Sequence, residues 1–335
     1  MKNLFYLATA ACIMAACSNN DVDLEEITHP VNAVPIQLSQ NVNGITARGV
    51  IENGSDVTTT ILTCNSNSAA NWSDFNPKLN NTVNDASALT DWANVSTATF
   101  KAGTNAAISL TTPLYYYTDN NTYLAAVAPA GTATSTTVDL LKQDGEQDVM
   151  YASADAGTKP SGSPASATNL AFSHLTTQLK FALGKSNNKG NGDWSATIYI
   201  KEITLQNAQV PTAVTFATGN VIWSNATSLS IPGITSSVVP AYPNTVSAGR
   251  SVMVNASDRL LLNVMLSIDG EDKSYVNIPV KNQEGKANLQ TVIGSSHLIT
   301  LTVKEPVTPT GEAALVPTAT VTPWNVGGEG SGTLE

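Results

Sequence analysis

The stretch "RLLLNVMLSIDGEDKSYVNIPV", residues 259–280, decides the fold class of this chain. Two apolar-rich runs flank the pair Asp269-Gly270. Asp-Gly is favoured in two-residue hairpin turns because such turns need positive φ at their central positions. We therefore predict an antiparallel β-hairpin over this stretch.

Short alternating segments of the same kind recur along the chain, and no long amphipathic helix accompanies them. They lie at residues 33–39, 56–64, 106–117, 122–129, 170–184, 196–208 and 295–306. Strands with turn signals at this spacing are typical of β-sandwiches. Residues 66–95 are expected to form a short helix or an irregular excursion. The Pro/Gly/Ser-rich stretch at 156–169 is the predicted domain boundary.

Length and composition narrow the class of protein. The 335 residues are enough for two domains with their own cores. Apolar residues make up 42% of the chain and charged residues only 13%, which indicates a globular protein. The net charge of −10 argues against nucleic-acid binding, since neutralising phosphates needs clustered Lys and Arg.

The N-terminus, "MKNLFYLATAACIMAACSNN", has the pattern of a secretory signal peptide. Lys2 precedes an apolar run that ends in small residues before Cys17. The run is far shorter than the ~20 residues that a membrane-spanning helix needs. Its end, "MAAC", resembles a bacterial lipobox. We therefore expect residues 1–16 to be a signal peptide and Cys17 to carry lipid.

An acidic segment, "SNNDVDLEEITHP", follows Cys17 directly. It has the composition of a flexible tether. It also resembles the signal that directs some lipoproteins to the outer face of the outer membrane, and a plain solvated spacer is the alternative. Of the three cysteines, Cys12 would leave with the signal peptide and Cys17 would be acylated, so Cys64 would have no intramolecular disulfide partner.

Motifs of catalysis, metal binding and cofactor binding are missing from the sequence. The chain has three histidines, and two of them, His174 and His297, fall in strand patterns where packing explains them better than catalysis. The acidic clusters "DGEQD" (144–148) and "DGED" (269–272) fit solvated turns better than calcium sites. We therefore expect no enzyme, no metal and no cofactor.

Several segments in order carry a resemblance to a known family. They are "TARGVI", "YLAAVAPAG", "QDVMYASA", "FSHLTTQLKFAL" and "ATVTPWNVGGEGSG". Together with the lipobox and the acidic tether, the chain resembles the fimbrillin family, the type V pilins and fimbrillin-like lipoproteins of anaerobic Gram-negative bacteria. The resemblance implies an all-β fold of two transthyretin-like β-sandwich domains in tandem, with a C-terminal extension that resembles a donor strand. The implied ranges are 17–48 for the tether and a removable first strand, 49–165 and 166–305 for the two domains, and 306–335 for the extension.

The resemblance also implies a proteolytic site. In such pilins an arginine-specific protease cuts after an arginine that follows the first strand, and here Arg48-Gly49 matches that position. A turn-rich segment beyond Asn43-Gly44 would be exposed, as protease sites are. The strand removed would comprise residues 31–40. A chance arginine in a surface loop is the alternative.

The C-terminal segment of a neighbouring subunit is expected to fill the groove that the lost strand leaves. The candidate donor residues are Leu315, Val316, Ala319, Val321, Trp324 and Val326. Pro317 and Pro323 cannot donate to a ladder, so they need bulges, strand ends or edge positions. Alternatively, the tail completes the sheet of its own domain.

We therefore expect a structural pilin subunit of a cell-surface fimbria, which serves adhesion. Its expected partners are other pilin subunits in a homo- or hetero-polymer, an arginine-specific protease, and the outer membrane through lipid. The alternative is a monomeric outer-membrane surface lipoprotein that binds glycans or host proteins. An enzyme acting on surface polysaccharide would need paired carboxyl groups in a cleft, and no motif points to one.

Overall fold

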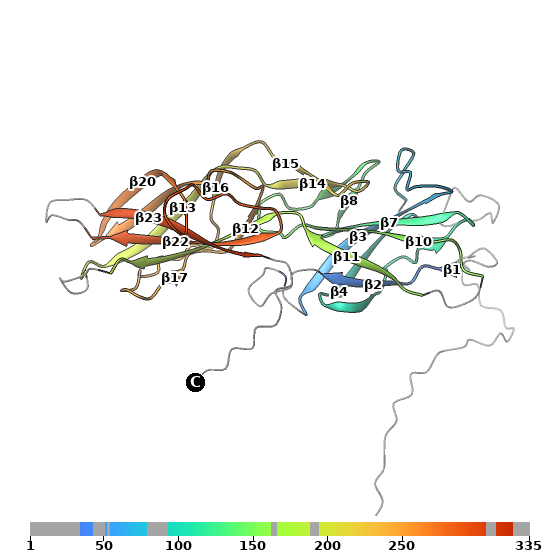
Figure 1. Ribbon diagram of the computed structural model, residues 1–335, viewed down its shortest axis with the longest axis horizontal. Coiled ribbons are helices and arrows are strands. Elements are labelled where there is room, and N and C mark those ends of the chain that lie inside the picture. Colours follow the sequence, from blue (N-terminus) through green and yellow to red (C-terminus); the bar gives the residue numbers. More distant parts are fainter. Residues whose placement is uncertain are drawn as a thin grey trace, which may run out of the picture.

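A computed structural model describes seven parts of the chain: residues 34–42, 51, 54–78, 93–161, 166–187, 194–305 and 313–323. These residues form strands, turns and irregular connections and contain no helix, so none of their segments is a helix able to cross a bilayer. The predicted all-β class is confirmed. The strands form two lobes along the long axis of the molecule (Figure 1).

The first lobe is built on a seven-stranded sheet in the order β4-β3-β7-β10-β11-β2-β5. In that order the strands are Val95–Lys101, Asp56–Ser66, Asn121–Ala128, Met150–Gly157, Thr168–His174, Leu38–Val42 and Thr104–Ile108. A two-residue strand, β1 (Val34–Pro35), pairs with β6 (Tyr115–Tyr116) beside it.

Both faces of this sheet are buried at its centre. On β7, Leu124 and Ala126 face one cluster of apolar side chains, and Ala125 and Val127 face another. This follows from the two-residue period of a strand. We call the first cluster, which includes Leu38, the first core, and the second the bridging core.

The bridging core lies under a four-stranded sheet in the order β15-β14-β9-β8. Its strands are Asn220–Trp223, Pro211–Thr215, Thr137–Leu140 and Gly131–Ala133. They come from both halves of the sequence and lie where the two lobes meet (Figure 1). Three rings fill this core edge to face: Trp72, Phe75 and Phe216, with centroids 4.8–5.5 Å apart.

The second lobe is a sandwich of two sheets around a large apolar cluster, which we call the second core. One sheet has the order β17-β12-β22-β23-β21, with β18 also on β12. These strands are Val246–Ser247, Thr177–Lys185, Ser295–Lys304, Ala314–Pro323, Lys281–Asn282 and, for β18, Val252–Val254. The facing sheet has the order β16-β13-β19-β20, comprising Thr227–Ser230, Ile198–Ala208, Leu261–Ile268 and Glu271–Pro279.

The predicted hairpin over 259–280 is confirmed. Strands β19 and β20 pair antiparallel from Leu261↔Pro279 to Ile268↔Glu271. The turn residues Asp269 and Gly270 have φ of 50° and 89°, as a two-residue hairpin turn requires.

The predicted strand at 170–184 is wrong, because the chain changes sheets in its middle. Strand β11 ends at His174 and pairs with β10 and β2 of the first lobe, whereas β12 begins at Thr177 and pairs with β22 of the second. The boundary expected at 165/166 therefore falls before a strand of the first sheet. The number of domains stays a prediction.

Two other expectations changed in detail. The stretch 106–117 holds the end of β5 and the short β6, separated by an irregular connection that contains Pro113. Of the stretch 66–95, residues 67–78 form bends and turns with no helix, and residues 79–92 lie outside the described parts.

Candidate functional site

Strand β2 is inserted between two strands that are distant in sequence. It pairs in parallel with β11, from Leu38↔Thr168 to Val42↔Phe172, and antiparallel with β5 on its other side. Leu38 and Val42 are each 3% exposed and belong to the first core. Gln40 lies between them, fully buried, and its Nε2 donates to the carbonyl oxygen of Lys101 at 2.8 Å. Without β2, β11 and β5 would flank an open slot.

The chain leaves β2 at Val42, and the described structure resumes at Ile51, which packs against the first core. The strand therefore extends two residues past the predicted 31–40. Arg48 and Gly49 lie between these points and outside the described residues, as does Cys17. Their assignments stay predictions.

Strand β23 pairs with β22 along its whole length, from Ala314↔Lys304 to Pro323↔Ser295. On its other side, β21 covers it only at Thr318 and Ala319. In this conformation the tail completes a sheet of its own chain. Pro323 is the last residue of the strand, and Pro317 has no partner on β21. Both positions agree with the strand ends and edges expected for prolines.

Of the side chains of β23 that the structure describes, at residues 314–320, Pro317 and Ala319 are buried and the others are half-buried or exposed. Ala319 is 3% exposed, whereas Leu315 is half-buried at the margin of that core, and Val316 is also half-buried. For Val321 only the backbone is described, and Trp324 and Val326 lie outside the described residues. Strand β23 is thus paired with β22 along its whole length, and its two large described side chains are only half-buried.

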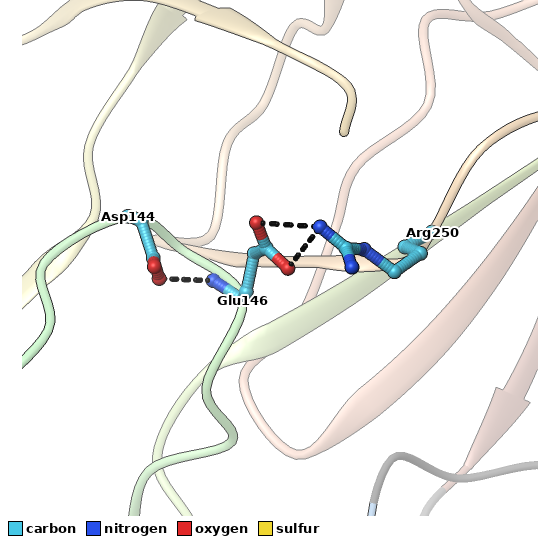
Figure 2. A network of polar contacts seen from close by, with 3 residues as sticks. All are labelled: Asp144, Glu146 and Arg250. Atoms are coloured by element: carbon cyan, nitrogen blue, oxygen red, sulfur yellow. Dashed lines mark hydrogen bonds and ion pairs between the residues drawn. The ribbon is translucent and has the colours of Figure 1, made fainter. Parts of the chain in front are cut away.

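A cavity of about 540 Å³ lies beside the start of β3, between it and the connection from β9 to β10. The ionisable residues that line it are Asp56, Lys142, Asp144, Glu146, Asp148 and Arg250. Nη2 of Arg250, which precedes β18, contacts Oε2 of Glu146 at 2.8 Å and Oε1 at 3.1 Å (Figure 2). The backbone N–H of Glu146 donates to Oδ1 of Asp144 at 2.9 Å, closing a turn. We call this cavity the junction pocket, since residues from both lobes line it.

The prediction that "DGEQD" is a solvated turn holds for Asp144 but is wrong for Asp148, which is buried. Asp144 is exposed, as expected, but Asp148 is 4% exposed, and its Oδ2 lies 2.8 Å from Nδ1 of His174, the last residue of β11. Burial raises the pKa of the Asp148 carboxyl, and the contact with His174 opposes that rise. His174 is packed, as predicted. Nothing in the local sequence identifies this pair, because the two residues approach only through the antiparallel pairing of β10 and β11.

Two other reactive side chains, His297 and Cys64, lie on described strands. His297 on β22 is fully buried, and burial lowers its pKa. Cys64 on β3 is buried, which raises the pKa of its thiol to about 11 and makes it a poor nucleophile. No group of three His, Cys, Asp or Glu side chains in the described parts is arranged to hold a metal ion.

The comparisons with known proteins agree with the strand arrangement. A model of the fimbrillin-like family matches residues 45–324. A fimbrial protein from Bacteroides vulgatus is 12% identical, with a TM-score of 0.50, over 86% of this chain and 99% of that one. A fimbrilin from Porphyromonas gingivalis is 12% identical, with a TM-score of 0.43, over 88% of this chain and 99% of that one.

At 12% identity the Bacteroides vulgatus structure supports the fold alone. No curated protein matches the chain. The family model covers far more than half of the sequence. The chain therefore belongs to the fimbrillin-like family.

Proposed function

We propose that this protein is a structural pilin subunit of a cell-surface fimbria and serves adhesion. It would be exported as a lipoprotein precursor, with Cys17 as the lipid attachment site. An arginine-specific protease would then cut between Arg48 and Gly49, and the subunits would polymerise by strand exchange. Family membership supports the pilin-like role.

The position of β2 is the observation that carries this proposal. Strand β2 lies between β11 and β5, one strand in from the edge of the sheet, and it follows the two-residue β1. The segment 43–50, which holds Arg48, is what joins β1 and β2 to the rest of the chain. A cut there would leave β2 held by non-covalent contacts alone. Its departure would leave unpaired backbone groups on both neighbours, which an extended segment satisfies by β-augmentation.

The tail strand β23 is the proposed donor, with Leu315, Val316, Ala319, Val321, Trp324 and Val326 as its contact residues. Its support is that β21 pairs with it only at Thr318 and Ala319, and that the described side chains of Leu315 and Val316 are only half-buried. Side chains that alternate along the strand would enter the neighbour's slot in place of Leu38 and Val42.

Replacement of Arg48 tests the proposal. We expect Arg48→Ala cells to retain a folded lipoprotein and to form no fimbriae, because β2 would keep its slot. Arg259→Ala, which removes an exposed arginine elsewhere, is the matched control and should assemble normally. N-terminal sequencing of shed wild-type protein should begin at Gly49. Normal fimbriae from the Arg48→Ala strain would refute cleavage-dependent assembly.

The pairing of β23 with β22 favours a second candidate, a monomeric surface lipoprotein that binds glycans or host proteins. A tail that stays in its own sheet would satisfy its hydrogen bonds without a neighbour. Electron microscopy separates the two, since purified, cleaved protein should form filaments only if the tail is donated.

A further inference from the structure

We propose that Gln40 fixes the register of β2 in the slot between β11 and β5, through one buried hydrogen bond to the backbone of Lys101. Gln40 is then the positioning residue of the strand, and the carbonyl oxygen of Lys101 is the reference point against which the strand is placed. This role belongs to the uncut chain, so it does not depend on cleavage after Arg48.

The apolar pattern of this segment does not by itself determine the register. Val34, Ile36, Leu38 and Val42 pack against the first core at intervals of two or four residues. Because side chains along a strand alternate with a period of two, a slip of two residues keeps the same face inward. If the strand advanced by two residues, Ile36 would replace Leu38 in the first core and Val34 would replace Ile36. The core would still receive apolar side chains.

Gln40 makes the two registers different. It is fully buried, and its Nε2 donates at 2.8 Å to the carbonyl oxygen of Lys101, the last residue of β4. Strand β4 is not a neighbour of β2 in the sheet, so this bond is separate from the ladder pairing. In the advanced register an apolar side chain would lie at the position of Gln40 and leave that oxygen without its donor. The amide would lie about 7 Å further along, where Val42 now packs, at ~3.3 Å per residue. Unpaired buried polar groups are costly, so the described register is favoured.

The acceptor is held in place without help from β2. Lys101 continues into the corner between β4 and β5. There the N–H of Ala102 donates to the carbonyl oxygen of Ser55, and the N–H of Gly54 donates to that of Ala102, both at 2.8 Å. Since neither bond involves β2, the carbonyl of Lys101 can act as a fixed reference for the strand.

The amide of Gln40 also carries a cost that a purely stabilising residue would avoid. Its Oε1 is buried and has no hydrogen-bond partner among the described residues. An apolar side chain of similar size would not bury an unpaired oxygen. A single polar side chain in an apolar seam is a known means of selecting one register at some expense of stability. The half-satisfied amide therefore favours a positioning role.

The register of β2 sets the length of the connection that follows it. Residues 43–50 join Val42, the last residue of the strand, to Ile51, which packs against the first core. A strand advanced by two residues would lengthen this connection by two. Under the proposed function the connection holds Arg48, so Gln40 would also determine how far along the chain the cut lies from the slot.

Disulfide trapping in the uncut precursor tests the proposal. Ser39 on β2 lies opposite the exposed Ala107 of β5, within the distance that a disulfide spans. An advanced strand would bring Gln37 to the place of Ser39. Ser39→Cys/Ala107→Cys therefore reports the described register, and Gln37→Cys/Ala107→Cys reports the slipped one. Cys12 and Cys17 are replaced by serine, and mass spectrometry of the cross-linked peptides quantifies each disulfide.

With Gln40 present, we expect the first disulfide to form at least tenfold faster than the second. Gln40→Met removes the amide and keeps a side chain of similar length, so the slipped disulfide should form at least fivefold faster than with Gln40. Leu38→Ala is the matched control on the same face of the strand. A slip would bring the large Ile36 into the space that this substitution empties, yet the described register should persist because Gln40 keeps its acceptor.

Two outcomes would each overturn the proposal. One is an unchanged ratio of the two disulfides in Gln40→Met. The other is a slipped disulfide in Leu38→Ala that forms as fast as the native one, and this arm decides the matter even where Gln40→Met does not fold. Both arms use uncut protein, so either result leaves cleavage after Arg48 and strand exchange to be judged by their own experiments.

Discussion

The two terminal strands differ in how the protein holds them. Strand β2 is short, pairs on both sides and places Leu38, Gln40 and Val42 in the interior. Strand β23 is twice as long and pairs fully on one side only. Of its described side chains, at residues 314–320, it buries Pro317 and Ala319. Strand β2 is therefore held by backbone pairing on both sides and by buried side chains, whereas β23 has full pairing on one side only. Under the proposed function, the deeply held strand needs a covalent cut before it can leave, whereas the lightly held strand can exchange without one.

The largest effect is expected from Leu38→Ala in the uncut precursor. Leu38 is 3% exposed in the first core, and removing such a side chain costs about 2–5 kcal/mol through lost burial and the cavity left behind. Urea denaturation of the precursor measures it. The same substitution should have no effect on protein that starts at Gly49, since β2 is then gone. An equal loss in both forms would contradict the removal of β2.

A smaller effect on stability is expected from Leu315→Ala, the matched change on β23. Leu315 is half-buried at the margin of the second core, so the monomer should lose about 1 kcal/mol. Filament yield from cleaved protein should nevertheless fall clearly, because the side chain would be buried in the neighbour's slot. A loss of monomer stability as large as that of Leu38→Ala would show that β23 is not lightly held.

Acid should weaken the sheet that holds β23. His297 lies opposite Val321 in the pairing of β22 with β23, and its burial lowers its pKa below the ordinary value of 6.5. Below pH 6.5 this histidine takes up a proton in the unfolded chain more readily than in the folded chain. The free energy of unfolding is therefore highest above that pH and declines as the pH falls. The decline attributable to this group is at most about 1.4 kcal/mol per pH unit. Urea titrations at pH 7.5 and 5.5 should show a smaller decline in His297→Gln, and an unchanged decline would contradict this assignment.

The smallest effect is expected at Cys64, which tests whether the loss of β2 stays local. Cys64 lies on β3, which is not a neighbour of β2, and burial raises the pKa of its thiol to about 11. At pH 8 its alkylation should be about 100-fold slower than that of a free thiol, from the smaller thiolate fraction alone. The rate, followed by mass spectrometry of the peptide that holds Cys64, should stay low after the cut. Rapid alkylation would mean that losing β2 unfolds the first lobe.

Sequence patterns predicted the strands well where local chemistry determines them. The Asp269-Gly270 turn fixed its hairpin, and the alternation at 196–208 and 295–306 matches β13 and β22 to within a few residues. The strand at 170–184 was mispredicted because apolar residues continue across Leu175-Thr176, where the chain changes sheets. The spacing of apolar residues indicates which side chains are buried, but it does not indicate which sheet the strand joins.

In the candidate site, too, local sequence predicts some features and pairing between distant segments determines the others. The alternation at 33–39 predicts one strand near the N-terminus, whereas the structure has β1 at Val34–Pro35 and β2 only from Leu38 to Val42. The insertion of β2 between β11 and β5 depends on pairing that no local pattern encodes. The contacts of Asp148 with His174 and of Glu146 with Arg250 also join distant segments, and both acids lie in a stretch that resembles an ordinary turn.

Disulfide cross-linking between subunits tests the exchange of β2 for β23 most directly. The exposed residues Asn169 on β11 and Thr320 on β23 belong to different sheets of one chain. In Asn169→Cys/Thr320→Cys protein cut after Arg48, Cys12 and Cys17 are removed and Cys64 is buried. Oxidised filaments should give a ladder of covalent oligomers on a non-reducing gel, with Thr318→Cys in place of Thr320→Cys to test the register. Filaments that form but show no ladder with either pair would contradict the account.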